Sequence, residues 1–219
     1  MNRWRQGIHE KLFASYLPED PVIVEGGAHI GTDSTAMAKT WRRGTIHAFE
    51  PVPEIYEKLV LNTRQYPNII TYPYALGMVS GHQKMYISSG ESDASSSLLK
   101  PKEHLQFFPG VHFKTDKVVE TVALDDWSFK YQVPKVDLMW LDLQGFEMEA
   151  MKGGMSLLPL VSCIYLEVNT AENYSGCPLF DQIYDWLSSN GFRLQSFIAE
   201  SECYGNAIFI KNKPLEDAS

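Results

Sequence analysis

Short runs rich in β-branched residues alternate with helical segments along most of the chain, and this alternation constrains the fold more than any other feature. Strands that alternate with helices form a mostly parallel sheet with helices on both faces, which is the doubly wound, Rossmann-like α/β class. The runs predict strands at 21–25, 45–49, 69–75, 136–141, 163–167, 192–197 and 207–210.

The segments between these strands carry helix signals. Pro53 lies where a first helical turn does not need the missing N–H, and Gly191 is suited to end a helix. Because the last two predicted strands are joined only by ESECYGN, we expect the last strand to turn back antiparallel. The predicted helices are 32–42, 53–65, 147–158 and 178–190.

A chain of 219 residues is expected to form one domain, here 1–219, in which residues 1–20 would be an amino-terminal helical extension. One region departs from the simple alternation: residues 77–125 are an insert or lid in this interpretation. It contains a predicted hairpin strand at 84–87, after the turn signal Ser-Gly, and a further strand at 118–124. The fold class therefore includes a β-hairpin and loop insert.

The insert contains the polar sequence SSGESDASSS at residues 88–97. One interpretation is an exposed flexible loop. The other is a lid formed by residues 88–115, because loops above a rigid sheet hold many substrate contacts in α/β proteins. In that interpretation Ser95, Ser96 and Ser97 lie near the entrance, and Ser96 and Ser97 contact the substrate.

Composition excludes several partners. With 19 basic and 27 acidic residues the formal charge is −8, so the chain offers no positive surface for nucleic acid. The longest apolar runs, 138–141 and 207–210, are far shorter than the roughly 20 residues of a spanning helix, and no secretory signal is visible. The odd set of cysteines, without C-x-x-C spacing, favours a reducing compartment and hence a cytoplasmic protein: Cys163, Cys177 and Cys203.

The first predicted strand runs as VIVEGGAHIG into a helix, and a glycine-rich turn of this kind lets a ligand approach the backbone at a helix amino terminus. A dinucleotide fingerprint counted from Gly26 fails at Ala28, and no G-K-[ST] follows for a phosphate loop. What remains is Glu25-x-Gly27-x-x-x-Gly31. An acid here attracts a cation, and S-adenosylmethionine carries both an amino group and a sulfonium.

The second predicted strand ends at Glu50, 19 residues after Gly31. A carboxylate at this place in such folds accepts hydrogen bonds from both ribose hydroxyls. It can do so for a dinucleotide as well as for S-adenosylmethionine. His29, inside the first loop, is expected to pack or form a hydrogen bond there. The remaining candidate cofactor contacts follow the second and third strands: Pro51, Ala75 and Leu76.

Four segments together resemble the FkbM-type family of S-adenosylmethionine-dependent methyltransferases: VIVEGGAHIG, IHAFEPVPE, ETVALDDW and WLDLQGFEMEAMKG. The resemblance covers roughly residues 20–198, and its most specific part is the motif Asp142-x-Gln144-Gly145-x-Glu147. It implies a class I methyltransferase sheet, S-adenosylmethionine as cofactor, and methylation of hydroxyls on sugars, glycolipids or polyketides.

This chain departs from the family pattern at four places. Glu25 stands where Asp is commoner and His29 where Asn is commoner. Trp140 replaces a frequent Lys and Gln144 a frequent Glu, which leaves the neighbourhood of Asp142 with one fewer charge of each sign.

Asp142 ends a strand that we place near the centre of the sheet, where ligands bind in open α/β folds. It is the first candidate for the base that removes the hydroxyl proton, and Glu167 is the second; both can face the same crevice. Two alternatives remain. Asp142 could cap the helix that follows Gly145, or it could bind a divalent cation together with Glu167 and Asn169, as in other hydroxyl methyltransferases with strand-end acids. The second is not favoured, and no metal is expected.

The six histidines show no ligand spacing, which argues against a zinc centre. His104 and His112 flank the sequence HLQFFPGVH beyond the serine run, so they are candidate acceptor contacts or alternative bases, and Gln144 is a further candidate contact. The leading hypothesis is methyl transfer to a hydroxyl of a small molecule or glycan. The alternatives are an NAD-linked oxidoreductase and a non-catalytic S-adenosylmethionine-binding protein.

Overall fold

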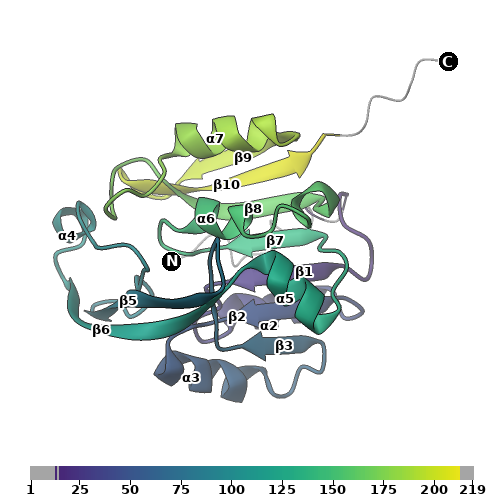
Figure 1. Cartoon of the computed structure of the whole chain (residues 1–219), viewed down its shortest axis with the longest axis horizontal. Coiled ribbons are helices and arrows are strands. Elements are labelled where there is room, and N and C mark those ends of the chain that lie inside the picture. Colours follow the sequence, from purple (N-terminus) through teal and green to yellow (C-terminus); the bar gives the residue numbers. More distant parts are fainter. Residues whose placement is uncertain (1–12, 14, 213–219) are drawn as a thin grey trace.

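The computed structural model describes residue 13 and residues 15–212. Its main sheet has seven strands in the order β3-β2-β1-β7-β8-β10-β9, which Figure 1 shows from bottom to top with β7 in the middle. The first five of these strands are parallel, and β10 is antiparallel to both of its neighbours. The doubly wound class and the antiparallel last strand are therefore confirmed. The strands are β1 (Val22–Gly26), β2 (Thr45–Phe49), β3 (Ile69–Tyr72), β7 (Leu138–Leu141), β8 (Cys163–Asn169), β9 (Phe192–Ala199) and β10 (Tyr204–Lys211).

Both faces of this sheet are covered, so its inner strands are buried along most of their length rather than at alternate residues. Successive side chains of a strand point to opposite faces: Ile23 of β1 packs with Met37 and Leu59, whereas Val24 packs in the cluster of Trp127 and Met151. The helices therefore form two layers. They are α2 (Thr32–Thr40), α3 (Pro53–Thr63), α5 (Leu124–Tyr131), α6 (Glu147–Lys152) and α7 (Phe180–Ser189).

The insert forms a second sheet in the order β4-β6-β5, and Figure 1 shows its two long strands, β5 and β6, extending beside the main sheet. The strand expected at 84–87 is present within β5, but it does not pair across the Ser80-Gly81 turn. It pairs with β6, where Lys84 lies opposite Val118, and both strands are longer than predicted. Leu124 does not end a strand, as predicted, but begins α5. The elements of this region are β4 (Ala75–Leu76), β5 (Gly81–Gly90), α4 (His104–Phe107) and β6 (Val111–Val122).

Two predicted elements are too long. The strand predicted at 69–75 ends at Tyr72, because Pro73 has no N–H for a further ladder bond, and the chain then crosses to the second sheet. The helix predicted at 147–158 ends at Lys152, and a short 3-10 turn, η2 (Leu158–Leu160), follows. A Cβ on Gly153 would lie 2.1 Å from the carbonyl oxygen of Gly77. The backbone at Gly153 therefore passes so close to Gly77 that only glycine fits there.

Most of the predicted helical extension at 1–20 lies outside the described residues. In its described part, Phe13 and Leu17 are buried in the cluster that contains Met37. Within the described residues, every helix is too short or too polar to cross a membrane.

Candidate functional site

The site lies at the edge of the sheet where the parallel strands end. Glu50 directly follows β2 and Asp142 directly follows β7, while Glu167 lies near the end of β8. Because β1, β2, β7 and β8 run in parallel, these acids reach one crevice, which is where ligands bind in open α/β sheets.

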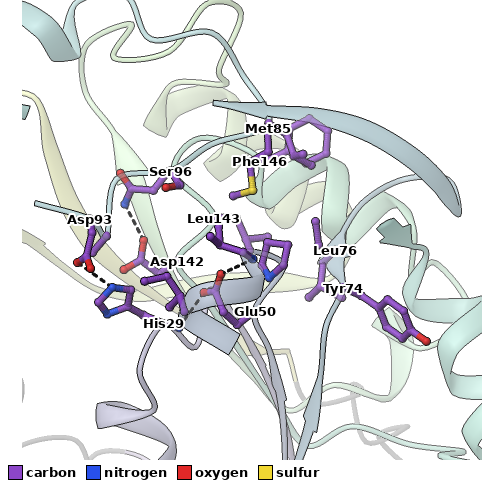
Figure 2. Close-up of a pocket in the computed structure, with 18 residues that line it drawn as sticks. His29, Glu50, Tyr74, Leu76, Met85, Asp93, Ser96, Asp142, Leu143 and Phe146 are labelled. Carbon is purple, nitrogen blue, oxygen red and sulfur yellow. Dashed lines mark hydrogen bonds and ion pairs between the residues drawn. The ribbon is translucent and has the colours of Figure 1, made fainter. Parts of the chain in front are cut away.

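The first cavity, which we call the Glu50 pocket, spans about 660 Å³, part of which is open to solvent. Figure 2 shows Glu50 and Asp142 on one side of it, with Leu76, Met85 and Phe146 facing them. The pocket is lined by Gly27, His29, Glu50, Pro51, Val52, Ile55, Tyr74, Ala75, Leu76, Met85, Asp93, Ala94, Ser96, Leu98, Asp142, Leu143, Gln144 and Phe146.

The two motif glycines have different tasks. Gly27 has φ +79, and a Cβ there would lie 2.0 Å from the carbonyl oxygen of Asp142, so only glycine permits this approach of the two loops. Gly31 is the N-cap of α2 with φ +84, and a Cβ there would meet the side chains of Leu59 and Thr63 at 2.8 Å. Gly27 lines the Glu50 pocket, whereas Gly31 allows the loop to pack against α3 behind it.

Glu50 is buried, and backbone N–H groups fix its carboxylate. Val52 donates to Oε1 at 2.8 Å and His29 donates to Oε2 at 3.1 Å. Burial raises the pKa of Glu50 to about 7, against the lowering effect of these two hydrogen bonds. Since a carboxylate has about four acceptor sites, both oxygens retain capacity for donors from the pocket.

Glu25 does not line the Glu50 pocket in the described structure, although the loop pattern places it among the cofactor contacts. Its side chain is buried, and Ser34 of α2 donates a hydrogen bond to Oε2. Burial raises the pKa of Glu25 to about 8. The side chain thus joins β1 to α2 beneath the loop, a contact that sequence spacing did not reveal.

The insert closes one side of the Glu50 pocket. Met85 comes from β5, while Ala94, Ser96 and Leu98 come from the serine-rich segment. His29 Nε2 lies 3.0 Å from Asp93 Oδ1, and Figure 2 shows this pair joining the first loop to the insert.

The second cavity, which we call the Glu167 pocket, spans about 700 Å³, part of which is open to solvent. It shares Ala94, Asp142 and Gln144 with the Glu50 pocket, so the two cavities meet at these residues. It is lined by Ser92, Ala94, Ser95, His104, Phe108, Val111, Asp142, Gln144, Glu167, Asn169, Asn173, Tyr174 and Tyr204.

Gln144 connects the two strand-end acids. Its Nε2 donates to Asp142 Oδ1 at 2.7 Å and to Glu167 Oε1 at 2.8 Å, which uses both hydrogens of the amide. Tyr174 donates its hydroxyl hydrogen to Gln144 Oε1 at 2.7 Å, and Ser97 donates to the Gln144 carbonyl oxygen at 2.8 Å. Gln144 also has a left-handed backbone with φ 53. This amide holds Asp142 and Glu167 near each other without adding a charge.

The pKa values of Asp142 and Glu167 are both raised, as is useful in a general base. Asp142 faces the cavity, yet the protein around the cavity desolvates it and raises its pKa to about 6, while the Gln144 hydrogen bond opposes the shift. Burial and the neighbouring Asp142 raise the pKa of Glu167 well above its ordinary value. A carboxylate whose pKa approaches neutrality is a more effective general base than one of ordinary acidity.

Helix capping is not the role of Asp142. The N-cap of α6 is Phe146, and among the described residues no side-chain hydrogen bond caps this helix. Glu147 instead stabilises the preceding loop: its Oε1 accepts N–H donors from Leu143 at 2.7 Å and Gly145 at 3.3 Å. Burial raises the pKa of Glu147 to about 7. The capping alternative for Asp142 is therefore wrong.

The four remaining candidate substrate contacts have different surroundings. Ser96 lines the Glu50 pocket, and His104 lines the Glu167 pocket. Ser97 is buried against Gln144, and His112 lies exposed on β6 opposite Ser89; both are outside the linings of the two pockets as described. Burial lowers the pKa of His104.

The alternative metal set stays a prediction. Asp142, Glu167 and Asn169 all line the Glu167 pocket, but the Asn169 Oδ1 already accepts a hydrogen bond from Asn173 at 2.7 Å. In the described part of the chain, no group of three or more His, Cys, Asp or Glu side chains is arranged to hold a metal ion.

Several lining residues gave no signal in the sequence. The aromatic and apolar members come from segments far apart in the chain, and only the fold brings them together. The missed residues include Tyr74, Met85, Leu98, Phe108, Phe146, Asn173, Tyr174 and Tyr204.

Comparisons with known proteins agree with this geometry. The chain is 29% identical over 187 residues to the 2-O-methyltransferase NoeI of Sinorhizobium fredii, covering 83% of this chain and 77% of that protein. It is 24% identical to the hexuronic acid methyltransferase AglP of Haloferax volcanii, covering 73% of this chain and 60% of that protein.

In fold, the chain is similar to the fibrillarin of Aeropyrum pernix, whose structure contains natively bound S-adenosyl-L-methionine. The TM-score is 0.53 at 12% identity, with 89% of this chain and 69% of that chain covered. The family model of the methyltransferase FkbM domain matches residues 25–194. The chain therefore belongs to the FkbM family of S-adenosylmethionine-dependent methyltransferases.

Proposed function

We propose that this methyltransferase moves the methyl group of S-adenosylmethionine to a hydroxyl oxygen of a sugar or glycan. NoeI and AglP, by their names a 2-O-methyltransferase and a hexuronic acid methyltransferase, support this choice of acceptor. The observation that carries the proposal is the meeting of two cavities at Asp142 and Gln144. Such a junction is what a two-substrate transfer needs, because it aligns donor and acceptor before reaction.

The Glu50 pocket fits the cofactor. Glu50 offers acceptors for the ribose hydroxyls, while Ile55, Leu76 and Leu98 provide apolar wall for the adenine. Asp142 at the junction supplies negative charge for the sulfonium. When bound, S-adenosylmethionine provides an activated methyl group: the new bond to the acceptor oxygen forms as the carbon–sulfur bond breaks, and the sulfur keeps the electron pair.

The chain's own contribution is to orient the acceptor and accept its proton. Asp142, in its ionised form, takes the hydroxyl proton as the oxygen attacks, and Glu167 is the second candidate. Gln144 keeps both carboxylates directed at the junction through its amide nitrogen. Ser96 and His104, which line the pockets, are proposed as further contacts of the substrates, whereas Ser97 would act through Gln144.

The cytoplasm is the proposed location. Cys163, Cys177 and Cys203 are buried and unpaired in the described structure, as is usual in a reducing compartment. The formal charge of −8 argues that the acceptor is not a nucleic acid.

The test begins with the cofactor. Calorimetry should show binding of S-adenosylmethionine and not of NAD; the match to methyltransferases already disfavours the oxidoreductase alternative. Replacing Glu50 with Ala should weaken this binding by about 1–3 kcal/mol, because the ribose donors lose their acceptor. Exposed Glu57 on α3 provides the matched control, and Glu57→Ala should bind normally. Unchanged affinity in Glu50→Ala would remove Glu50 from the site.

The acceptor is then sought with a panel of sugars and glycosides, isotope-labelled S-adenosylmethionine and mass spectrometry of the product. A methylated sugar hydroxyl supports the proposal. Cofactor binding without transfer to any sugar or polyol in the panel would contradict it and favour the non-catalytic binding protein.

A further inference from the structure

The wall of the Glu167 pocket has an unusual charge distribution. It contains the carboxylates of Asp142 and Glu167, yet none of its described lining residues is a lysine or arginine. The neighbouring Lys102 is paired with Glu172 outside the lining. His104 adds no positive charge, because burial lowers its pKa and keeps the imidazole neutral at pH 7. The pocket therefore brings together acidic side chains without a basic partner. Burial and the neighbouring Asp142 raise the pKa of Glu167, and a cation bound beside it favours the ionised carboxylate.

Two buried polar atoms of residues in this wall lack a hydrogen-bond partner among the described residues. Asn173 uses its Nδ2 hydrogens on Asn169 Oδ1 and the Cys203 carbonyl oxygen, which leaves Oδ1 buried and, among the described residues, without a partner. His104 Nδ1 is likewise buried and unpartnered within the described structure. An unpaired buried polar atom is costly, so this side of the wall is polar rather than apolar.

Asp142 and Glu167 differ in which bound molecule can place a positive charge beside them. Asp142 lines both pockets and so lies beside the position proposed for the positively charged cofactor. Glu167 lines only the pocket on the other side, and Gln144 Nε2 donates to its Oε1. No described residue donates to Glu167 Oε2, so this oxygen is free to accept a hydrogen bond from a ligand in the pocket.

We infer that the Glu167 pocket selects an acceptor that carries a protonated amino group, such as an amino sugar, over the corresponding acid. This inference rests on the proposed function, since it names the class of acceptor for the same site. An ammonium group supplies three donors and one positive charge, which matches the Glu167 carboxylate, whose Oε2 receives no hydrogen bond from the described residues. A carboxylate in the same place would be a third acid beside Asp142 and Glu167 with no lysine or arginine in the lining, and like charges at short range disfavour its binding. The chain would then differ from AglP, whose name states a hexuronic acid acceptor.

The experiment compares three methyl glycosides that differ in one exocyclic group: aminomethyl, hydroxymethyl or carboxylate, each in the glucose and mannose series. Binding is measured by calorimetry in the presence of S-adenosylhomocysteine, so the result does not depend on turnover. We expect the amine to bind at least about tenfold more tightly than the acid, with the neutral sugar between them and the ratio falling as salt is raised. Equal or tighter binding of the acid, or no binding of any of the three, overturns the inference.

A charge variant tests the pocket itself. Ser92 lines the Glu167 pocket, so Ser92→Lys should reduce or reverse the preference for the amine. Ser188→Lys adds the same charge on the exposed face of α7 and should leave the preference unchanged. Equal shifts in both variants would mean that overall charge, not the pocket, sets the selectivity.

Methyl transfer to the same glycosides separates this inference from the proposed function. Methylated acid together with tighter acid binding would keep the function and overturn the charge preference. Selective amine binding without any methylated product would support the pocket's preference and contradict the methyl transfer.

Discussion

Replacing Asp142 with Asn removes the proposed base with little change of shape. The amide oxygen of Asn can still accept the hydrogen bond that Gln144 Nε2 gives to Asp142 Oδ1 at 2.7 Å. The backbone N–H of residue 142 still donates to the Gly26 carbonyl oxygen at 3.0 Å, and α6 has its own N-cap at Phe146. The melting temperature should therefore change little, and rates are compared at saturating cofactor because the variant also loses the negative charge beside the sulfonium.

The rate should fall sharply in this variant. A positioned general base contributes about 10²- to 10⁴-fold, which corresponds to about 2.7–5.4 kcal/mol of transition-state stabilisation. Because the pKa of Asp142 is raised to about 6, the wild-type rate should also fall as the pH drops below about 6 and the base is protonated. Asp142→Asn should lose this acid limb along with its turnover.

The assay is the initial rate of labelled methyl transfer between about pH 5 and about pH 9, with melting curves recorded alongside. Asp185→Asn, on the exposed face of α7, is the matched control and should be fully active. Near-normal turnover in Asp142→Asn would refute the assignment and direct the search to Glu167 or to the histidines. If chelator abolished wild-type activity and magnesium restored it, Asp142 would be a metal ligand instead.

Three further outcomes follow from the same structure. Gly27→Ala should lower the free energy of unfolding in urea by more than about 2 kcal/mol, because its Cβ would lie 2.0 Å from a carbonyl oxygen. In the control Gly81→Ala the new Cβ meets open space, so the loss should be less than about 1 kcal/mol. Burial raises the pKa of Glu25 to about 8 and of Glu50 to about 7 from about 4.5, so their contribution to stability is full below about pH 4.5 and is lost as the pH rises through the folded values. The ligand-free protein should thus melt at a lower temperature at pH 8 than at pH 5, and a higher melting temperature at pH 8 would contradict these pKa values. Residues 88–115, the predicted lid, should exchange amide hydrogens fastest near the serine run and slow down with cofactor plus acceptor; full protection without ligand would mean a fixed loop.

Sequence alone determined the frame of this protein. Strand and helix periodicity and turn chemistry act over only a few residues. Short sequence patterns therefore predict the alternation of strands and helices, the glycine turn after β1 and the acids at the strand ends. Parallel strands bring their carboxyl ends to one edge, so the proximity of Glu50, Asp142 and Glu167 could also be predicted.

Tertiary structure decided the direction of each side chain and what it meets. Glu25 and Ser97 turn inward, toward Ser34 and Gln144, because packing of neighbouring elements leaves them facing protein and not the cavity. The insert forms a second sheet that lines one side of the Glu50 pocket. Pro73 follows the end of β3, and the chain then continues into β4, which pairs with β6.

The link between Asp142 and Glu167 was equally beyond the sequence. Residues 142 and 167 end neighbouring strands, yet their contact depends on Gln144, on its left-handed backbone and on the hydroxyl of Tyr174 from a distant loop. Hydrogen bonds of this kind require the donor and acceptor atoms to be placed to within a few tenths of an ångström. These atoms come from residues far apart in the chain, so no local sequence pattern encodes them. The sequence placed the acids at one edge, and only packing in three dimensions joined them into one site.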